Sequence, residues 1–168
     1  LIIATGAQAR VPDIEGLDSV DFRTSDTLWS LRELPGRLVV IGGGPIGCEL
    51  SQAFARLGSR VTQIQKGPRL LPREDVDAST LIEARFQQEG IEVVTDCEAV
   101  RVERHDDGKG GILIGQRDGT EVRFEFDRLI LALGRKPNVS GFGLEELGVV
   151  IEKSGTVQAD TLMRTNYP

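Results

Sequence analysis

The sequence predicts an α/β fold in which helices cover the faces of a parallel sheet and an antiparallel three-stranded meander is attached. Three observations support this prediction. Four consecutive apolar residues, Leu38–Ile41, indicate a buried strand. Strand and helix patterns then alternate as far as residue 94, and right-handed crossovers between such units give a parallel sheet. After residue 97 the apolar residues recur at every second position, which is typical of antiparallel strands.

Two short elements are expected before this central strand. Leu1–Gly6 is apolar and is expected to form a buried strand that ends at a glycine turn. Thr24 and Ser25 suit the N-cap of a short helix that ends before Pro35. Trp29 lies in that helix and is expected to be a packing residue.

A helix is expected directly after the central strand. Pro45 suits its first position, and Gly58 lies just beyond its last apolar residue. The helical spacing predicts a packed face made of Ile46, Leu50, Ala53, Phe54 and Leu57.

The parallel sheet continues with two further strands and a second helix. Strands are expected at 60–65 and 91–94, with the loop Lys66–Arg73 between the first of them and the helix. The helix begins near Asp75 or Asp77 and ends at Gly90. Its inner face is expected to carry Ala78, Leu81, Ile82 and Phe86.

The meander is indicated by apolar–polar alternation around Val102 and Phe124, with Asp-Gly turns at 107–108 and 118–119. Leu129–Gly134 returns as a buried strand. Beyond residue 140 only short pieces are expected: one helical turn around Leu144 and strands near Val149 and Val157.

The turn between the central strand and its helix has the pattern Gly-x-Gly-x-x-Gly at Gly42, Gly44 and Gly47. In a dinucleotide site the first glycine permits the tight turn, the second admits a pyrophosphate, and the third lets the helix pack on the strand. The amides and the positive end of the helix then hold the phosphates. The pattern therefore predicts a Rossmann-like nucleotide site; the alternative is a tight strand–helix turn without a ligand.

Composition excludes some classes of partner. The net charge of −6, without a basic run, argues against nucleic acid. No apolar run reaches the roughly 20 residues that a membrane helix needs. Cys48 and Cys97 belong to no metal or redox spacing, so we expect two buried thiols in a reducing, cytoplasmic setting.

Four motifs in order resemble the pyridine nucleotide–disulfide oxidoreductase family, and the resemblance covers essentially the whole chain. They are Ala4-Thr5-Gly6, the Gly-rich stretch 42–49, Gly134-Arg135-Lys136-Pro137-Asn138 and Arg164-Thr165-Asn166. Pro45 together with the stretch 70–75 is most similar to the mercuric reductase and dihydrolipoamide dehydrogenase branch.

The resemblance implies the domain organisation. Residues 37–138 are the NAD(P)H-binding domain, 1–36 are a flanking piece of the flavin domain with a connector, and 139–168 return towards the flavin domain. Hydride passes from the nicotinamide to an FAD held by other parts of the parent chain, which also has a C-terminal dimerisation domain and is a homodimer. The chain has no Cys-x-x-x-x-Cys pair, and by itself it is expected to bind a nucleotide and to catalyse nothing.

The nucleotide preference is open. Gln65 ends the second strand, where a carboxylate would accept hydrogen bonds from the adenine ribose and repel a 2′-phosphate. Lys66 and Arg69 are candidate partners of a 2′-phosphate, or solvated loop charges. The cofactor is therefore NAD(H) or NADP(H).

By resemblance, Glu49 lies near the nicotinamide and the flavin and pairs with a lysine of the flavin domain; as a residue of a helix it is equally a surface carboxylate. Pro45 and Ile46 belong to the same turn and are expected to contact the cofactor. Pro45 stands where several relatives have a tyrosine that covers the nicotinamide pocket. Gly134 is expected beside the nicotinamide half.

Two other classes of function are compared with the same sequence features. A non-catalytic NAD(H)-sensing module that regulates a partner also fits the Gly-rich turn. A small standalone dehydrogenase lacks an acid–base group, because the single histidine, His105, lies in a polar turn.

Overall fold

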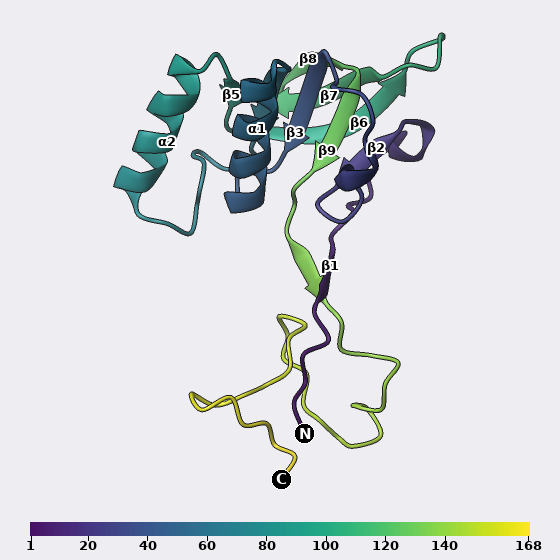
Figure 1. Cartoon of the computed structure of the whole chain (residues 1–168), viewed down its shortest axis with the longest axis vertical. Coiled ribbons are helices and arrows are strands. Elements are labelled where there is room, and N and C mark those ends of the chain that lie inside the picture. Colours follow the sequence, from purple (N-terminus) through teal and green to yellow (C-terminus); the bar gives the residue numbers. More distant parts are fainter. The chain divides into compact units, whose positions relative to one another are not determined.

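A five-stranded parallel sheet forms the core of residues Ala9–Gly134 in the computed structural model, which describes all residues 1–168 (Figure 1). Its strand order is β2-β9-β3-β4-β5. The bounds are β2 Phe22–Thr24, β9 Arg128–Leu131, β3 Arg37–Ile41, β4 Arg60–Ile64 and β5 Glu92–Val94. The expected parallel sheet is confirmed, with β3 at its middle.

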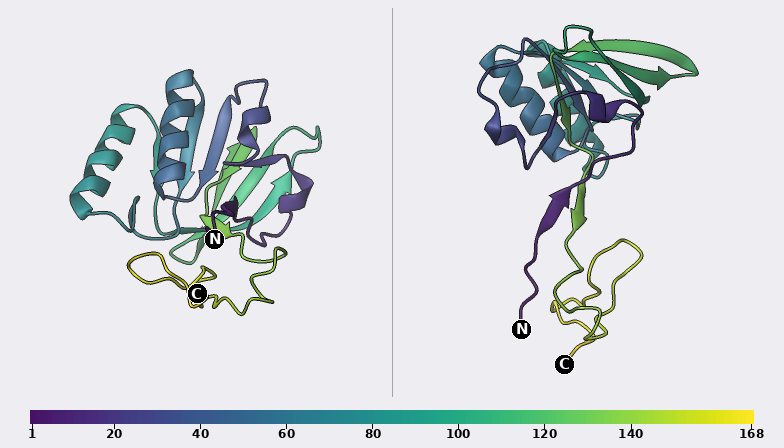
Figure 2. Two further views of the ribbon diagram at one scale, coloured as in Figure 1. Left: turned by 60° about the horizontal axis from the view of Figure 1, so that its bottom comes forward. Right: turned by 90° about the vertical axis from the view of Figure 1, so that its right-hand side faces the viewer.

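The two faces of this sheet are covered differently (Figure 2, right). Alternate residues of β3 point to opposite faces. Leu38 and Val40 pack with α1 (Pro45–Leu57) and α2 (Val76–Gln88), whereas Val39 and Ile41 pack against the second sheet. That second sheet is the expected antiparallel meander, with strands β6 Cys97–Arg104, β7 Gly111–Arg117 and β8 Thr120–Phe126. The α/β prediction is confirmed, with both α-helices on one face.

The chain divides into two units, Ala9–Gly134 and Leu1–Gln8 with Arg135–Pro168. A separate two-stranded sheet pairs β1 (Ala7–Ala9) with β10 (Arg135–Pro137). Beyond it the chain forms turns, including one near Leu144, and a single bridge between Ile151 and Val157. The assignment of 1–36 and 139–168 to a flavin domain stays a prediction.

The expected strand at 1–6 is wrong. Leu1 and Ile2 are exposed, and the segment forms no strand. Its Thr5 Oγ1 donates to the Asn138 carbonyl at 2.6 Å, and Asn138 Nδ2 donates to the Thr5 carbonyl at 2.9 Å. An apolar segment becomes a strand only with neighbours along its length, and one residue does not supply them.

The N-terminal helix is also wrong in extent. Thr24, expected as a cap, belongs to strand β2 at the edge of the central sheet, and only the 3₁₀ turns η1 (Leu17–Ser19) and η2 (Leu28–Ser30) form in this region. Trp29 is 75% exposed, and its Nε1 donates to the Ser25 carbonyl at 2.9 Å. Trp29 is therefore not a core residue.

The expected inner faces of the two helices are confirmed in part, because Leu50 and Phe54 of α1 and Ile82 and Phe86 of α2 pack with the apolar residues of the central sheet. The buried residues of α1 are Gly47, Cys48 and Ser51, while Leu57 is 68% exposed. Small residues occupy the most buried positions of α1 because the helix lies too close to the sheet there for large side chains. In α2 the buried positions are Ser79 and Phe86, and Leu81 is exposed.

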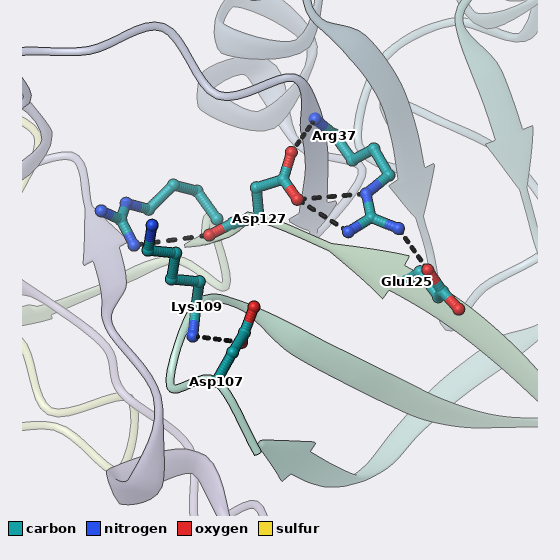
Figure 3. Close-up of polar contacts among 6 residues, drawn as sticks. Arg37, Asp107, Lys109, Glu125 and Asp127 are labelled. Atoms are coloured by element: carbon teal, nitrogen blue, oxygen red, sulfur yellow. Dashed lines mark hydrogen bonds and ion pairs between the residues drawn. The ribbon is translucent and has the colours of Figure 1, made fainter. Parts of the chain in front are cut away.

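An ion-pair cluster fixes the start of β3 to the end of β8 (Figure 3). The Arg37 guanidinium donates to Asp127 at 2.8 and 3.1 Å and also pairs with Glu125, while the Arg37 amide donates to Asp127 at 2.7 Å. Burial raises the pKa of Asp127, but the hydrogen bonds from Arg37 outweigh it and the pKa is lowered. The stabilisation, on the order of 1 kcal/mol for so exposed a pair, is therefore present above the unfolded-state pKa and lost as the pH falls through the folded-state pKa.

Neither α-helix combines the length and the apolar character that a bilayer crossing requires.

Candidate functional site

The candidate site lies at the carboxyl ends of the central strands, all within the larger unit. β3 and β4 end level with each other, since Ile41 pairs with Ile64, and β9 ends level with β3 at Leu131. The Gly-rich turn follows β3, Gln65 follows β4, and Gly134 follows β9. Ligands of open parallel sheets bind at this edge.

Gly42 and Gly47 are required by the packing of strand, turn and helix. Gly42 has φ +118°, and a Cβ there would lie 2.3 Å from the Ala132 carbonyl oxygen. A Cβ on Gly47 would lie 2.1 Å from the Gly42 carbonyl oxygen. Side chains at either position would therefore push α1 and β9 away from the turn. Both glycines have the structural roles that the spacing predicted.

Gly44 differs from both, because no atom lies within 4 Å of the Cβ it lacks. It is the N-cap of α1 with φ −78°, an ordinary extended conformation. The Cys48 amide donates to the Gly44 carbonyl, and Pro45 has no amide, so the open donors of the first turn are Ile46 and Gly47. No acidic residue lies in this turn. The positive end of α1 therefore faces open space beside Gly44.

Gln65 is bound to the turn rather than free. Its Oε1 accepts from the Gly43 amide at 2.9 Å, and a Cβ on Gly43 would lie 2.9 Å from the Gln65 side chain. The end of β4 thus supports the Gly-rich turn directly.

Lys66 and Arg69, the two expected partners of a 2′-phosphate, both interact with other groups of the protein. Lys66 Nζ pairs with Glu98 Oε1 at 2.6 Å, although both side chains are more than half exposed. Arg69 donates to three carbonyls of its own loop, those of Leu71, Pro72 and Glu74, at 2.9 to 3.1 Å.

The residues expected near the nicotinamide are all accessible. Glu49 and Pro45 are exposed on the first turns of α1, and Ile46 is half-buried. Gly134 is exposed with φ +91°, and nothing lies within 4 Å of the Cβ it lacks. Their roles towards a nicotinamide or a flavin stay predictions.

Cavities lie in both units. One of about 390 Å³ is bounded by Gly42, Lys66, Glu98, Arg10 and Leu133, next to the Gly-rich turn. A larger one, about 1010 Å³, is lined by residues of the smaller unit such as Ile3, Leu144 and Val149. The smaller cavity lies beside the ends of β3 and β4, and its lining does not include Gly44.

Sequence reasoning missed the residues behind the turn. Gln63 is completely buried, and its Nε2 donates to the Gly42 carbonyl at 2.8 Å. The Cys48 thiol lies 3.7 Å from both the Gly43 carbonyl and Gln63 Nε2, and burial raises its pKa. Gln63 was visible as a polar residue within an apolar strand, and such a residue needs a partner when buried. No comparable feature of the sequence pointed to Glu98 as the partner of Lys66.

Comparisons with known proteins identify relatives that match nearly the whole chain. Residues 1–168 match the family model described as pyridine nucleotide-disulphide oxidoreductase. The chain is 41% identical over 167 residues to a mercuric reductase of Streptomyces lividans, covering 99% of this chain and 35% of the relative. It is 36% identical over 174 residues to a dihydrolipoyl dehydrogenase of Thermus scotoductus, covering 99% and 36%.

Among solved structures, the flavoprotein disulfide reductase RclA of Escherichia coli superposes with a TM-score of 0.82 at 30% identity, covering 97% of this chain and 36% of that one. The chain thus spans about a third of the length of the proteins it matches.

Proposed function

The chain belongs to the pyridine nucleotide-disulphide oxidoreductase family, and from that premise we propose that it is the part of a flavoprotein that binds NAD(P)H. The family is FAD- and NAD(P)-dependent. In the whole protein, hydride from the nicotinamide passes to an FAD held by other domains. Glu49 and Gly134 lie close to the bound nicotinamide ring. The chain alone does not catalyse the reaction.

The open N-terminus of α1 carries this proposal. Gly42 and Gly47 bring strand and helix into backbone contact, and Gly44 leaves space in front of the first-turn amides. A pyrophosphate needs donors, a positive potential and room for close approach. All three meet at Gly44.

We further propose that the parent is an FAD-dependent oxidoreductase that works as a homodimer. The relatives are mercuric reductase and dihydrolipoyl dehydrogenase, and the chain accounts for about a third of each. The remaining domains supply the flavin, the electron acceptor's site and the dimer contacts.

NADH is expected to bind more tightly than NADPH, by about tenfold. A 2′-phosphate needs a free cation, and here Lys66 pairs with Glu98 while Arg69 donates to loop carbonyls. Calorimetric titration of the chain with each nucleotide measures the ratio. Lys66→Ala should leave the ratio within about twofold.

Tighter binding of NADPH, with the advantage lost in Lys66→Ala, would contradict the proposed preference. Binding of neither nucleotide would contradict nucleotide binding by this chain itself.

A further inference from the structure

We propose that Arg69 is a positioning residue that holds the Gly-rich turn in its phosphate-binding shape, and that it does not read a 2′-phosphate. The inference rests on the proposed function, because the turn is taken as the pyrophosphate site. The argument follows the hydrogen bonds from Arg69 to Gly44.

The Arg69 guanidinium donates hydrogen bonds to three carbonyls of its own loop. Nη1 donates to Leu71 at 3.1 Å, and Nη2 donates to Pro72 at 3.0 Å and to Glu74 at 2.9 Å. A guanidinium has five N–H donors and no acceptor, and these contacts use both hydrogens of Nη2 and one of Nη1. The half-buried Arg69 side chain therefore connects three backbone positions of the loop through hydrogen bonds.

The first consequence is the conformation of Leu71. This residue has φ +47°, a left-handed conformation that non-glycine residues adopt only when their surroundings impose it. Arg69 Nη1 at 3.1 Å and the Glu74 amide at 3.0 Å both donate to the Leu71 carbonyl, and the Leu71 amide donates to the Gly43 carbonyl at 2.7 Å. Leu71 thus connects Arg69 to the Gly-rich turn.

The second consequence is the orientation of the peptide between Gly43 and Gly44. In a trans peptide the C=O and the following N–H point in opposite directions. With the Gly43 carbonyl fixed on the Leu71 amide, the Gly44 N–H points to the other side of the peptide plane. Gln65 fixes the Gly43 amide independently, through its Oε1 at 2.9 Å. The amide that would meet a phosphate is therefore aimed by the loop.

The loop is anchored to α2 without the help of Arg69. The Leu70 amide donates to Glu83 Oε1 at 3.0 Å, Ser79 Oγ donates to the Leu70 carbonyl at 2.8 Å, and Leu70 itself is fully buried. Removing the guanidinium should therefore release residues 71–74 while the domain remains folded. That separation makes the inference testable.

The test compares Arg69→Met, which keeps a long apolar stem without donors, with the control Lys66→Met. If Arg69 positions the turn, Arg69→Met weakens NADH and NADPH by the same factor, about tenfold, since both carry the pyrophosphate. Lys66→Met should change neither by more than about twofold. A loss confined to NADPH would make Arg69 a 2′-phosphate ligand and overturn the inference, as would no loss at all.

Amide hydrogen exchange of the nucleotide-free chain gives a second readout. Arg69→Met should speed exchange of the Leu71 amide, which is bonded to Gly43, and leave the amides of α2 as protected as before. Unchanged protection of Leu71 would overturn the inference. If the unmodified chain binds neither nucleotide, the proposed function fails, and this exchange result still decides the role of Arg69.

Discussion

Gly47→Ala is expected to lower the free energy of unfolding by about 3 kcal/mol, one of the largest effects available in this chain. The new methyl group would lie 2.1 Å from the Gly42 carbonyl oxygen, which is backbone and has no rotamer to move away. Relief requires α1 to lift from β3, and that opens the layer that contains Cys48 and Val40. Urea denaturation followed by circular dichroism measures the loss.

Gly44→Ala is the matched control for this experiment. It lies in the same turn with φ −78° and open space around it, so it should cost less than about 1 kcal/mol. Equal stability of Gly47→Ala and the unmodified chain would mean that strand and helix do not meet closely at this turn.

Gly44→Val is expected to abolish tight nucleotide binding while leaving the fold intact. The backbone of residue 44 is extended and no atom lies within 4 Å of a Cβ placed there, so we expect the isopropyl group to be accommodated. It would fill the space in front of the Ile46 and Gly47 amides, where a pyrophosphate has to approach. We expect the NADH dissociation constant to rise by at least about a hundredfold, or 2.8 kcal/mol.

The readout is calorimetric titration with NADH, together with the thermal unfolding midpoint without ligand. A normal midpoint with lost binding identifies Gly44 as a contact surface. Unchanged NADH affinity in Gly44→Val would place the nucleotide elsewhere.

The central strand–turn–helix was predictable because its signals are local. The apolar run of β3, the spacing of the three glycines, and Pro45 and Gly58 at the ends of α1 each have one favoured structure. The meander was predictable for the same reason, since alternation and Asp-Gly turns are local patterns.

The wrong predictions concern segments whose structure depends on contacts with residues distant in the sequence. Leu1–Gly6 is as apolar as a strand, but it has no strand beside it. Phe22–Thr24 carries weak strand signals, yet it joins the sheet because the edge of β9 is available. Leu57 and Leu81 fit a helical period but are exposed, whereas Phe54 and Phe86 on the same predicted faces pack with the central sheet.

The candidate site shows the same division. Gly42, Gly44 and Gly47 were predictable from their spacing, with the contacts that glycine requires at the first and third. The engagement of Arg69 by loop carbonyls and of Lys66 by Glu98 depends on how the loop folds. No pattern in the sequence specifies those contacts, so both residues looked like free cations.

The most direct test of the account is to locate bound NADH on the chain by amide chemical-shift mapping. The account predicts that NADH shifts the amides of Gly44, Ile46 and Gly47 most strongly, and that the smaller unit, such as Val149, is unaffected. A matching titration with inorganic pyrophosphate should shift the same three amides. Shifts confined to other residues, or none at saturating NADH, would contradict the assignment of the Gly-rich turn as the nucleotide site.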